Sequence, residues 1–387
     1  MPSSAIEYPS FVFDSDLTRA IIELELERAR ADLNHGSTPP AVYRQLKELF
    51  QLLTSIMSAR IEGNRTSLLD AVSGAAKQRR GSPASFDEGV EEILNIQRAV
   101  EFIEREVPQG PISNLFIREL HNIAVAGLTR EGDRTPGAYR LGEVSIGQSN
   151  HTPPWPADVP DHMNGLINFI ADEVEPQKQL LQVAIAHHRF LWIHPFGNGN
   201  GRVSRLLTYS MLVKQGFTSS RDYRAVNPTA VFGANRAAYY DNLEKADDLS
   251  NEGVVDWSTY VLSGLNSDLK KLAKLSEFQF VAHEILLPAI ERMSASGRLT
   301  APEARALSIA ATKTVVSAGD LEPAFPGSAS SRSQAIRSLL DRGLLAKEAD
   351  SPRKYHLAFL PNDLTVHLVA RLDAVGLLPT ILADDPI

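Results

Sequence analysis

The sequence contains no cysteine among its 387 residues, which excludes disulfide bonds, thiolate metal sites and cysteine nucleophiles. No apolar run is long enough for a membrane span, and acidic Glu7, Asp14 and Asp16 stand where a signal peptide would carry basic residues. The formal net charge is −8, too mild to predict wholesale binding to nucleic acid. We therefore expect a soluble, cytoplasmic protein that does not bind membranes.

What the sequence does contain is helical periodicity over most of its length. Hydrophobic residues make up 43% and charged residues 22%, which is typical of a globular chain long enough for more than one domain. From Val42 to Met57 apolar side chains recur every three or four residues, and this helix should end at Gly63. Further helices are expected over residues 87–106, 114–127, 162–173, 177–193, 202–215, 234–246 and 256–275. The predicted fold is mostly α.

Two segments interrupt this helical pattern. Residues 137–154 are rich in glycine and proline, with short extended pieces around Val144 and Ile146, and predict an exposed β-hairpin flap. Near residue 275 the long helical pattern gives way to shorter segments. There Ser331 followed by Gln334 predicts a capped helix before two short strands, which is the outline of a winged helix. We therefore predict an N-terminal helical region, a catalytic core and a winged-helix-like domain, over residues 1–110, 111–275 and 276–387.

The segment HPFGNGNGRVSR, from His194 to Arg205, carries the strongest chemical signal. It follows a stretch that is apolar nearly all round and should be a buried helix. Its glycines expose backbone N–H groups where the next helix begins and its macrodipole is positive, and Arg202 and Arg205 add two forks of phosphate donors. The pattern predicts a nucleotide polyphosphate site in which His194 takes a proton from an attacking hydroxyl, as in phosphoryl or nucleotidyl transfer.

These residues resemble the signature of the Fic family, HPFx(D/E)GNGRxxR. Members of that family are protein adenylyltransferases, which move AMP from ATP to a hydroxyl side chain, and their core is a helical bundle with one hairpin. The stretches GAYR, PP and NRAAYYDNL extend the resemblance over roughly residues 40–265. The resemblance implies ATP and Mg²⁺ as co-substrates, and as partner a target protein with a Ser, Thr or Tyr hydroxyl, or the chain itself.

The resemblance also implies roles for individual residues. The general base would be His194, and Phe196 would anchor its loop. The phosphates would be held by a set of backbone and guanidinium groups from Gly199, Asn200, Gly201, Arg202 and Arg205. The nucleotide would also meet side chains elsewhere in the core, namely Arg189, Tyr239 and Tyr240. Packing explains the two tyrosines equally well.

Two further positions complete the implied site. The flap would align the target segment by strand addition, through Val144, Ser145, Ile146 and Gly147. Asn198 stands where the family usually has an acidic magnesium ligand. An amide oxygen can ligate the ion but brings no charge, so we expect weaker metal binding or altered activity.

Glu62 lies in the last turn of the first long helix, where an acid faces the negative end of the macrodipole. The surrounding SARIEGNR resembles the family's inhibitory motif (S/T)xxxE(G/N), with Ser58, Glu62 and Gly63 in the matching places. In family members with this helix, spanning about residues 42–63 here, the glutamate pairs with the second arginine, here Arg205. The resemblance therefore implies autoinhibition, and the alternative is a solvated acid at a helix end.

Other interpretations of the same residues stay open. The site could remove AMP from a modified protein, with Glu62 positioning water, or the chain could be a transcriptional regulator that only senses nucleotide. His187 and His188 point about 100° apart on a helix, which favours core histidines over a zinc site. In the last domain Arg332 and Arg337 could reach DNA, but the weak charge favours protein recognition or a homodimer contact.

Overall fold

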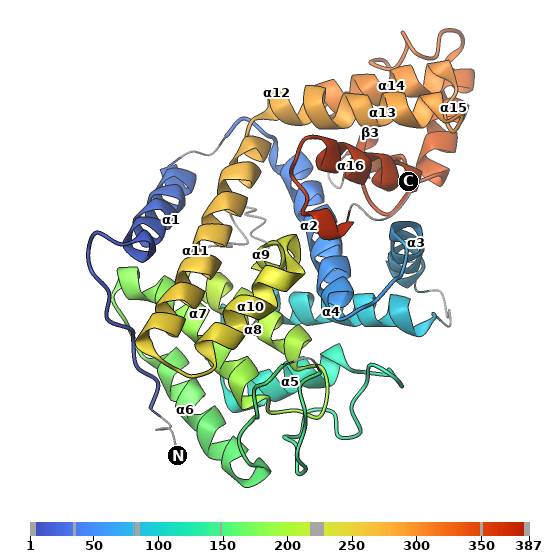
Figure 1. The fold of residues 1–387 in the computed structure, drawn as a ribbon. Helices are drawn as coiled ribbons and strands as arrows, with labels where there is room; N and C mark the ends of the chain where they lie inside the picture. Colours follow the sequence, from blue (N-terminus) through green and yellow to red (C-terminus); the bar gives the residue numbers. More distant parts are fainter. Residues whose placement is uncertain are drawn as a thin grey trace. The chain divides into compact units, whose positions relative to one another are not determined.

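The computed structural model describes residues 5–33, 36–79, 81, 86–147, 149–216, 228–348 and 351–382. Within these residues the chain is mostly helical with one small antiparallel sheet, as the sequence predicts (Figure 1). It divides into two compact units. Unit 1 comprises residues 1–34, 51–65 and 86–270, and unit 2 comprises residues 35–50, 66–85 and 271–387. The domain boundaries at 110 and 275 stay a prediction. None of the described helices is both long and apolar enough to cross a membrane.

Unit 1 is built around helices α7 (Pro176–Ile193) and α8 (Asn200–Lys214), which pack on each other. α7 is buried on almost every side because its sequence is apolar nearly all round. Around this pair lie α1 (Asp16–Leu33), the second half of α2 (Pro40–Ile61), α4 (Glu88–Glu106), α5 (Asn114–Ala124), α6 (Val159–Ala171), α9 (Pro228–Ala234), α10 (Arg236–Ala246) and α11 (Asn251–Ala273). The core therefore holds the turn between α7 and α8 rigidly.

The segment between α5 and α6 does not form the predicted β-hairpin in its described residues. Val144 and Ile146 lie in an extended loop without a strand partner, and the backbone N–H of Ser149 donates to the Ile146 carbonyl at 2.8 Å. Leu141 at its start is 94% exposed. Strand formation depends on a pairing partner, and the described residues of this segment contain no strand, so the predicted hairpin is not formed in them.

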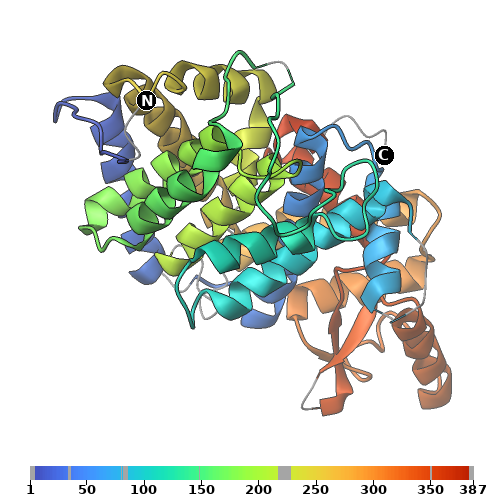
Figure 2. The ribbon, with the colours of Figure 1, turned by 90° about the horizontal axis from the view of Figure 1, so that it is seen from below.

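Unit 2 combines helices with a three-stranded antiparallel sheet. Its helical elements are α3 (Leu68–Arg79), α12 (Phe278–Phe280), the π-helical turn η3 (Val281–Leu286), α13 (Leu287–Ala295), α14 (Ala301–Lys313), α15 (Ala329–Asp341) and α16 (Asp363–Ala374). The strands β1 (Val316–Ser317), β2 (Leu345–Glu348) and β3 (Ser351–Leu357) lie in the order β1-β3-β2. Strands β2 and β3, orange in Figure 2, pair Leu345 with Leu357. The winged-helix assignment stays a prediction.

Helix α15 begins one turn earlier than the sequence predicts. Its N-cap is Ser328, whose hydroxyl accepts a hydrogen bond from the backbone N–H of Ser331 at 3.2 Å. The predicted capping pair of Ser331 and Gln334 is therefore wrong, and Ser331 lies inside the first turn. Several serines in a row can each cap a helix, and Ser328 follows Gly327, whose φ of 115° turns the chain into the helix.

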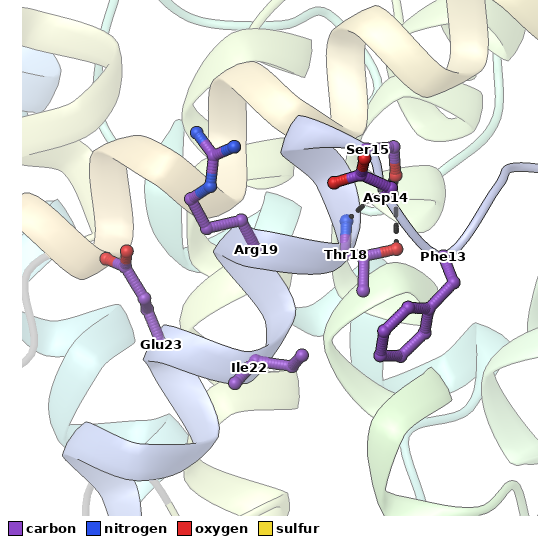
Figure 3. A pocket seen from close by; sticks show the side chains of 7 residues that line it. All are labelled: Phe13, Asp14, Ser15, Thr18, Arg19, Ile22 and Glu23. Atoms are coloured by element: carbon purple, nitrogen blue, oxygen red, sulfur yellow. Dashed lines mark hydrogen bonds between the residues drawn. The ribbon is translucent and has the colours of Figure 1, made fainter.

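A small hollow of about 180 Å³ lies at the start of α1 in unit 1 (Figure 3). Two of its lining residues are hydrogen-bonded, since the backbone N–H of Thr18 donates to the Ser15 hydroxyl at 3.2 Å. Phe13 at its rim is 83% exposed. The hollow contains none of the residues that the sequence analysis assigns to a site.

Candidate phosphate-binding site at the start of helix α8

His194 ends α7 in the left-handed backbone conformation, with φ 50° and ψ 61°. Its backbone N–H still donates to the Phe190 carbonyl at 3.0 Å, so the imidazole leaves a rigid helix. Two residues later Phe196 is fully buried, with its ring 3.8 Å from that of His121 and parallel to it. The Asn200 amide closes the loop, because it accepts from the Phe196 N–H at 3.0 Å and donates to the Phe196 carbonyl at 2.9 Å.

Glycines 199 and 201 let other groups approach the start of α8 closely. Gly199 is the N-cap with φ 76°, and a Cβ there would lie 2.9 Å from Val125. A Cβ on Gly201 would lie only 2.1 Å from a carboxylate oxygen of Glu62. No side chain in the described structure caps this helix. The start of α8 is therefore an electropositive backbone surface that an oxyanion can touch, and Glu62 already lies against it.

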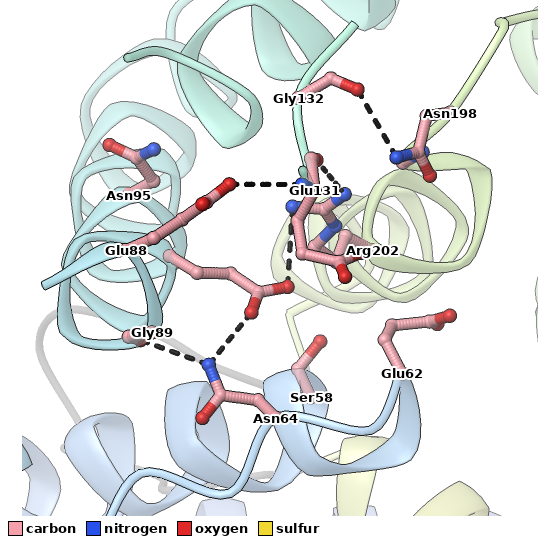
Figure 4. Close-up of polar contacts among 12 residues, drawn as sticks. Ser58, Glu62, Asn64, Glu88, Gly89, Asn95, Glu131, Gly132, Asn198 and Arg202 are labelled. Carbon is pink, nitrogen blue, oxygen red and sulfur yellow. Dashed lines mark hydrogen bonds and ion pairs between the residues drawn. The ribbon is translucent and has the colours of Figure 1, made fainter. Parts of the chain in front are cut away.

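Both arginines of α8 are almost completely buried, and each has a glutamate partner. Arg205 donates to the Ser58 hydroxyl at 2.9 Å, to the Ser58 carbonyl at 3.0 Å and to Glu62 at 2.7 Å. Arg202 donates to the Glu131 carbonyl at 2.6 Å (Figure 4). It also lies 3.3 Å from Glu92.

Three guanidinium nitrogens of these arginines are buried without a hydrogen-bond partner in the described structure. They are Nε and Nη1 of Arg202 and Nη1 of Arg205. Buried charged donors without acceptors are costly. A ligand with several anionic oxygens would satisfy them.

A support under Arg202 comes from the first turn of α4. The Glu88 carboxylate accepts backbone N–H bonds at 2.6–3.0 Å and a hydroxyl bond at 2.8 Å, from Thr129, Arg130 and Glu131. The Glu131 N–H and the Thr129 hydroxyl lower the pKa of this carboxyl to about 2. The turn that presents the Glu131 carbonyl to Arg202 is thereby fixed. Sequence reasoning missed Glu88 and Glu92, because acids near the start of a helix are common.

The imidazole of His194 is uncharged at neutral pH. Burial lowers its pKa to about 4, so the ring is neutral at pH 7. Its Nδ1 lies 3.3 Å from the Leu191 carbonyl, which can only accept, so Nδ1 carries the ring proton. This leaves the lone pair of Nε2 to take a proton from a hydroxyl.

The resemblance also assigns three other side chains to the nucleotide, and these differ in their burial and contacts. Arg189 lies over the Trp192 ring and donates to the Ala5 carbonyl at 3.4 Å. Tyr239 is 1% exposed and its hydroxyl lies 2.9 Å from His187, as in a packed core. Tyr240 is 42% exposed, with its pKa raised by burial and by the nearby charge of Glu62. Of these three residues Tyr240 is the most exposed, and its role at the nucleotide stays a prediction.

His187 and His188 are both buried, as expected for core histidines. His187 lies 2.7 Å from the Thr208 hydroxyl, and His188 lies 3.1 Å from Asp247. Burial lowers the pKa of both rings. Within the described residues no group of three or more His, Asp or Glu side chains could hold a metal ion.

Asn198 is held by hydrogen bonds on both ends of its side chain. Its Nδ2 donates to the Gly132 carbonyl at 3.1 Å, and its Oδ1 accepts from the Gly199 N–H at 2.7 Å. Its backbone N–H donates to Asp133 at 3.0 Å. The amide oxygen keeps a second lone pair, so Asn198 fits as one neutral ligand of a hard cation.

Comparison with known proteins finds similarity to one family. Residues 111–212 match the family model described as the Fic/DOC family. The protein adenylyltransferase Fic of Drosophila willistoni is 30% identical over 239 residues, 61% of this chain and 43% of the relative. The enzyme of the same name from Nematostella vectensis is 27% identical over 188 residues, 48% and 41% of the two chains. The chain thus spans less than half the length of these curated relatives.

Solved structures show the same fold. The structural match to a Fic family protein from Desulfovibrio desulfuricans covers 91% of this chain and 98% of that chain, with a TM-score of 0.55 and 20% identity. The structural match to residues 134–508 of Fic-1 from C. elegans covers 67% of this chain and 72% of that chain, with a TM-score of 0.53 and 21% identity. The chain therefore has the fold of these solved Fic structures.

Proposed function

We propose that this protein transfers AMP from ATP to a hydroxyl side chain of a protein. The observation that carries the proposal is the neutral imidazole of His194 beside the start of α8, where two arginines hold buried N–H groups without acceptors. The name of the relatives, protein adenylyltransferase Fic, supports the same reaction. A polyphosphate would satisfy the free donors, and the base would serve an attacking hydroxyl.

In the proposed step the target hydroxyl oxygen attacks the α-phosphorus of ATP. A new O–P bond forms, the bond between the α-phosphorus and the bridging oxygen breaks, and pyrophosphate leaves with that electron pair. Nε2 of His194 takes the hydroxyl proton. Arg202, Arg205 and the backbone N–H groups of Asn200 and Gly201 hold the outer phosphates and balance their charge. The target segment lies along the flap from Val144 to Gly147 as an added strand.

Magnesium belongs to the same proposal. Bound to the phosphates, the ion would neutralise charge that develops on the leaving pyrophosphate. The amide oxygen of Asn198 is the candidate protein ligand. We expect Asn198→Asp to lower the Mg²⁺ concentration that half-saturates transfer, because it adds a charge at the ligand position. An unchanged magnesium titration would remove Asn198 from the site.

We further propose that Glu62 inhibits the reaction. Burial alone would raise the pKa of the Glu62 carboxyl, but the Arg205 guanidinium holds it below its usual value, so the acid is charged at pH 7. The carboxylate then occupies both Arg205 and the space against Gly201. An outer phosphate of ATP needs that position, so nucleotide and Glu62 compete for it.

Labelled ATP tests the reaction directly. The Glu62→Gly chain is incubated with ATP labelled at the α-phosphate or at the γ-phosphate, and the label on protein is counted. We expect incorporation from the α-label alone, and none in the Glu62→Gly, His194→Ala double variant. Incorporation from the γ-label would indicate a kinase, and absence of both labels would contradict AMP transfer.

A further inference from the structure

Arg140 closes the GAYR segment and is 5% exposed. Its backbone N–H donates to the Pro195 carbonyl at 2.9 Å. Its guanidinium donates to backbone carbonyls of His194 at 2.8 Å, Gly142 at 3.1 Å, Pro154 at 2.6 Å and Ile193 at 3.4 Å. One buried side chain therefore joins the end of α7 to both ends of the loop over residues 142–154.

The contact to His194 acts at a strained point of the backbone. His194 is one of three non-glycine residues with positive φ among the described residues, a conformation that costs on the order of 1 kcal/mol or more. Arg140 holds the carbonyls on either side of this turn, those of Ile193 and Pro195, as well as that of His194 itself. A planar guanidinium can serve several acceptors at once, whereas an ammonium cannot reproduce that fork.

We propose that Arg140 is the positioning residue that fixes the loop over residues 142–154 at a set distance from the imidazole of His194. The inference rests on the proposed function, because that loop contains the residues on which the target segment would dock. The loop is tied at Gly142 and Pro154, on either side of Val144 to Gly147. A hydroxyl docked between these ties is therefore held relative to the base through Arg140, and a displacement of about 1 Å can cost roughly 100-fold in rate.

Arg140 also influences the imidazole through its charge. Burial is the main cause of the low pKa of His194, and the Leu191 carbonyl opposes it. Among charged and titratable groups, Arg140 and His151 lower this pKa further, and Glu62 raises it. Removing the charge at position 140 should raise the pKa of His194, whereas a lysine that keeps the charge should not. The two effects of Arg140 can therefore be separated.

The test compares Arg140→Lys and Arg140→Gln in the Glu62→Gly chain. We expect both to lower the rate of AMP incorporation at saturating ATP by roughly 100-fold. The affinity for ATP should stay within about threefold, because all three nitrogens of the Arg140 guanidinium donate to backbone carbonyls. The matched control is Arg118→Lys, since Arg118 also donates to a carbonyl of this segment, that of Gly137, but is exposed and contacts neither tie. Arg118→Lys should transfer AMP like its parent.

Two measurements without nucleotide complete the test. In Arg140→Lys, amide hydrogen exchange over residues 142–154 should be faster than in the parent. In Arg140→Gln, the pKa of His194 followed by NMR should rise, while Arg140→Lys leaves it unchanged. Unaltered exchange together with transfer equal to the parent would overturn the inference. If the Glu62→Gly parent transfers no AMP, the proposed function fails, and exchange and pKa still decide whether Arg140 fixes the loop.

Discussion

The two arginines of α8 are each paired with a glutamate, Glu62 directly after α2 and Glu92 within α4, and the two pairs differ. Glu62 hydrogen-bonds Arg205 at 2.7 Å and its side chain is 29% exposed. Glu92 lies 3.3 Å from Arg202 without a hydrogen bond to it, and its side chain is 2% exposed. The Glu62 carboxylate is therefore partly open to solvent. The other is sealed inside unit 1.

The charges of the two acids also respond differently to their surroundings. For Glu92, burial outweighs the attraction of Arg202 and the hydrogen bond from Asn64, and raises the pKa. For Glu62, Arg205 outweighs burial and lowers the pKa. The surroundings of Glu62 therefore stabilise its charged form, whereas the surroundings of Glu92 disfavour its charged form. We infer that Glu62 controls access to Arg205 and that Glu92 keeps Arg202 in place.

The largest expected effect is on stability. Glu92→Ala leaves the guanidinium of Arg202 buried without a carboxylate, and should lower the free energy of unfolding of unit 1 by about 3–5 kcal/mol. Glu62→Ala should cost about 2 kcal/mol or less, because Arg205 keeps both of its Ser58 acceptors. Urea unfolding of the two variants at pH 7 measures the difference. Equal losses, or a larger loss for Glu62→Ala, would contradict the distinction between the pairs.

The next largest effect is on activity, and here we expect the change at Glu62 to have the larger effect. A hydrogen-bonded charged pair contributes about 1.5–3 kcal/mol, so Glu62→Gly should raise AMP transfer by roughly 10–150-fold. Glu92→Ala should raise it by no more than about threefold, since it leaves Arg205 blocked. Intact-protein mass spectrometry after incubation with ATP counts the transferred AMP. Glu62→Gln, which keeps part of the contact without the charge, is the control and should fall between wild type and Glu62→Gly.

Much of this site follows from local sequence patterns. The turn after His194 and the start of α8 were predicted from glycines next to an apolar helix, and α2 ends at Ile61, close to the predicted stop at Gly63. These features depend on neighbours within a few residues, which a sequence displays directly. The approach of Glu62 to Arg205 spans 143 residues, and it came from the resemblance to a motif.

The remaining supports depend on packing between distant segments. Arg140 reaches carbonyls 14 and 54 residues away, and nothing in GAYR specifies those acceptors. Backbone carbonyls are present at every position, so a side chain that binds them leaves no pattern in the sequence. The predicted hairpin near Val144 failed for a related reason, since strand formation depends on a partner and not on propensity alone.

The smallest expected effect is a difference in pH dependence between the two glutamates. Glu92 has a raised pKa when folded, so it takes up its proton before the unfolded chain does. Wild type should therefore gain stability relative to Glu92→Ala as the pH falls from 7 towards the usual value of about 4.3. Glu62 has a lowered pKa, so its stabilisation is constant above about pH 4.3 and is lost only below it.

Calorimetric unfolding of wild type and both alanine variants between pH 7 and 3 measures these differences, at about 1.4 kcal/mol for each unit of pKa shift. The two difference curves should bend in separate pH ranges and in opposite directions. Glu244→Ala serves as the control, because Glu244 is exposed and its contact to Asn150 lies on the surface. The stability difference between wild type and Glu92→Ala could instead be constant down to pH 4. Burial would then not raise the pKa of Glu92, and both glutamates would form stabilising ion pairs.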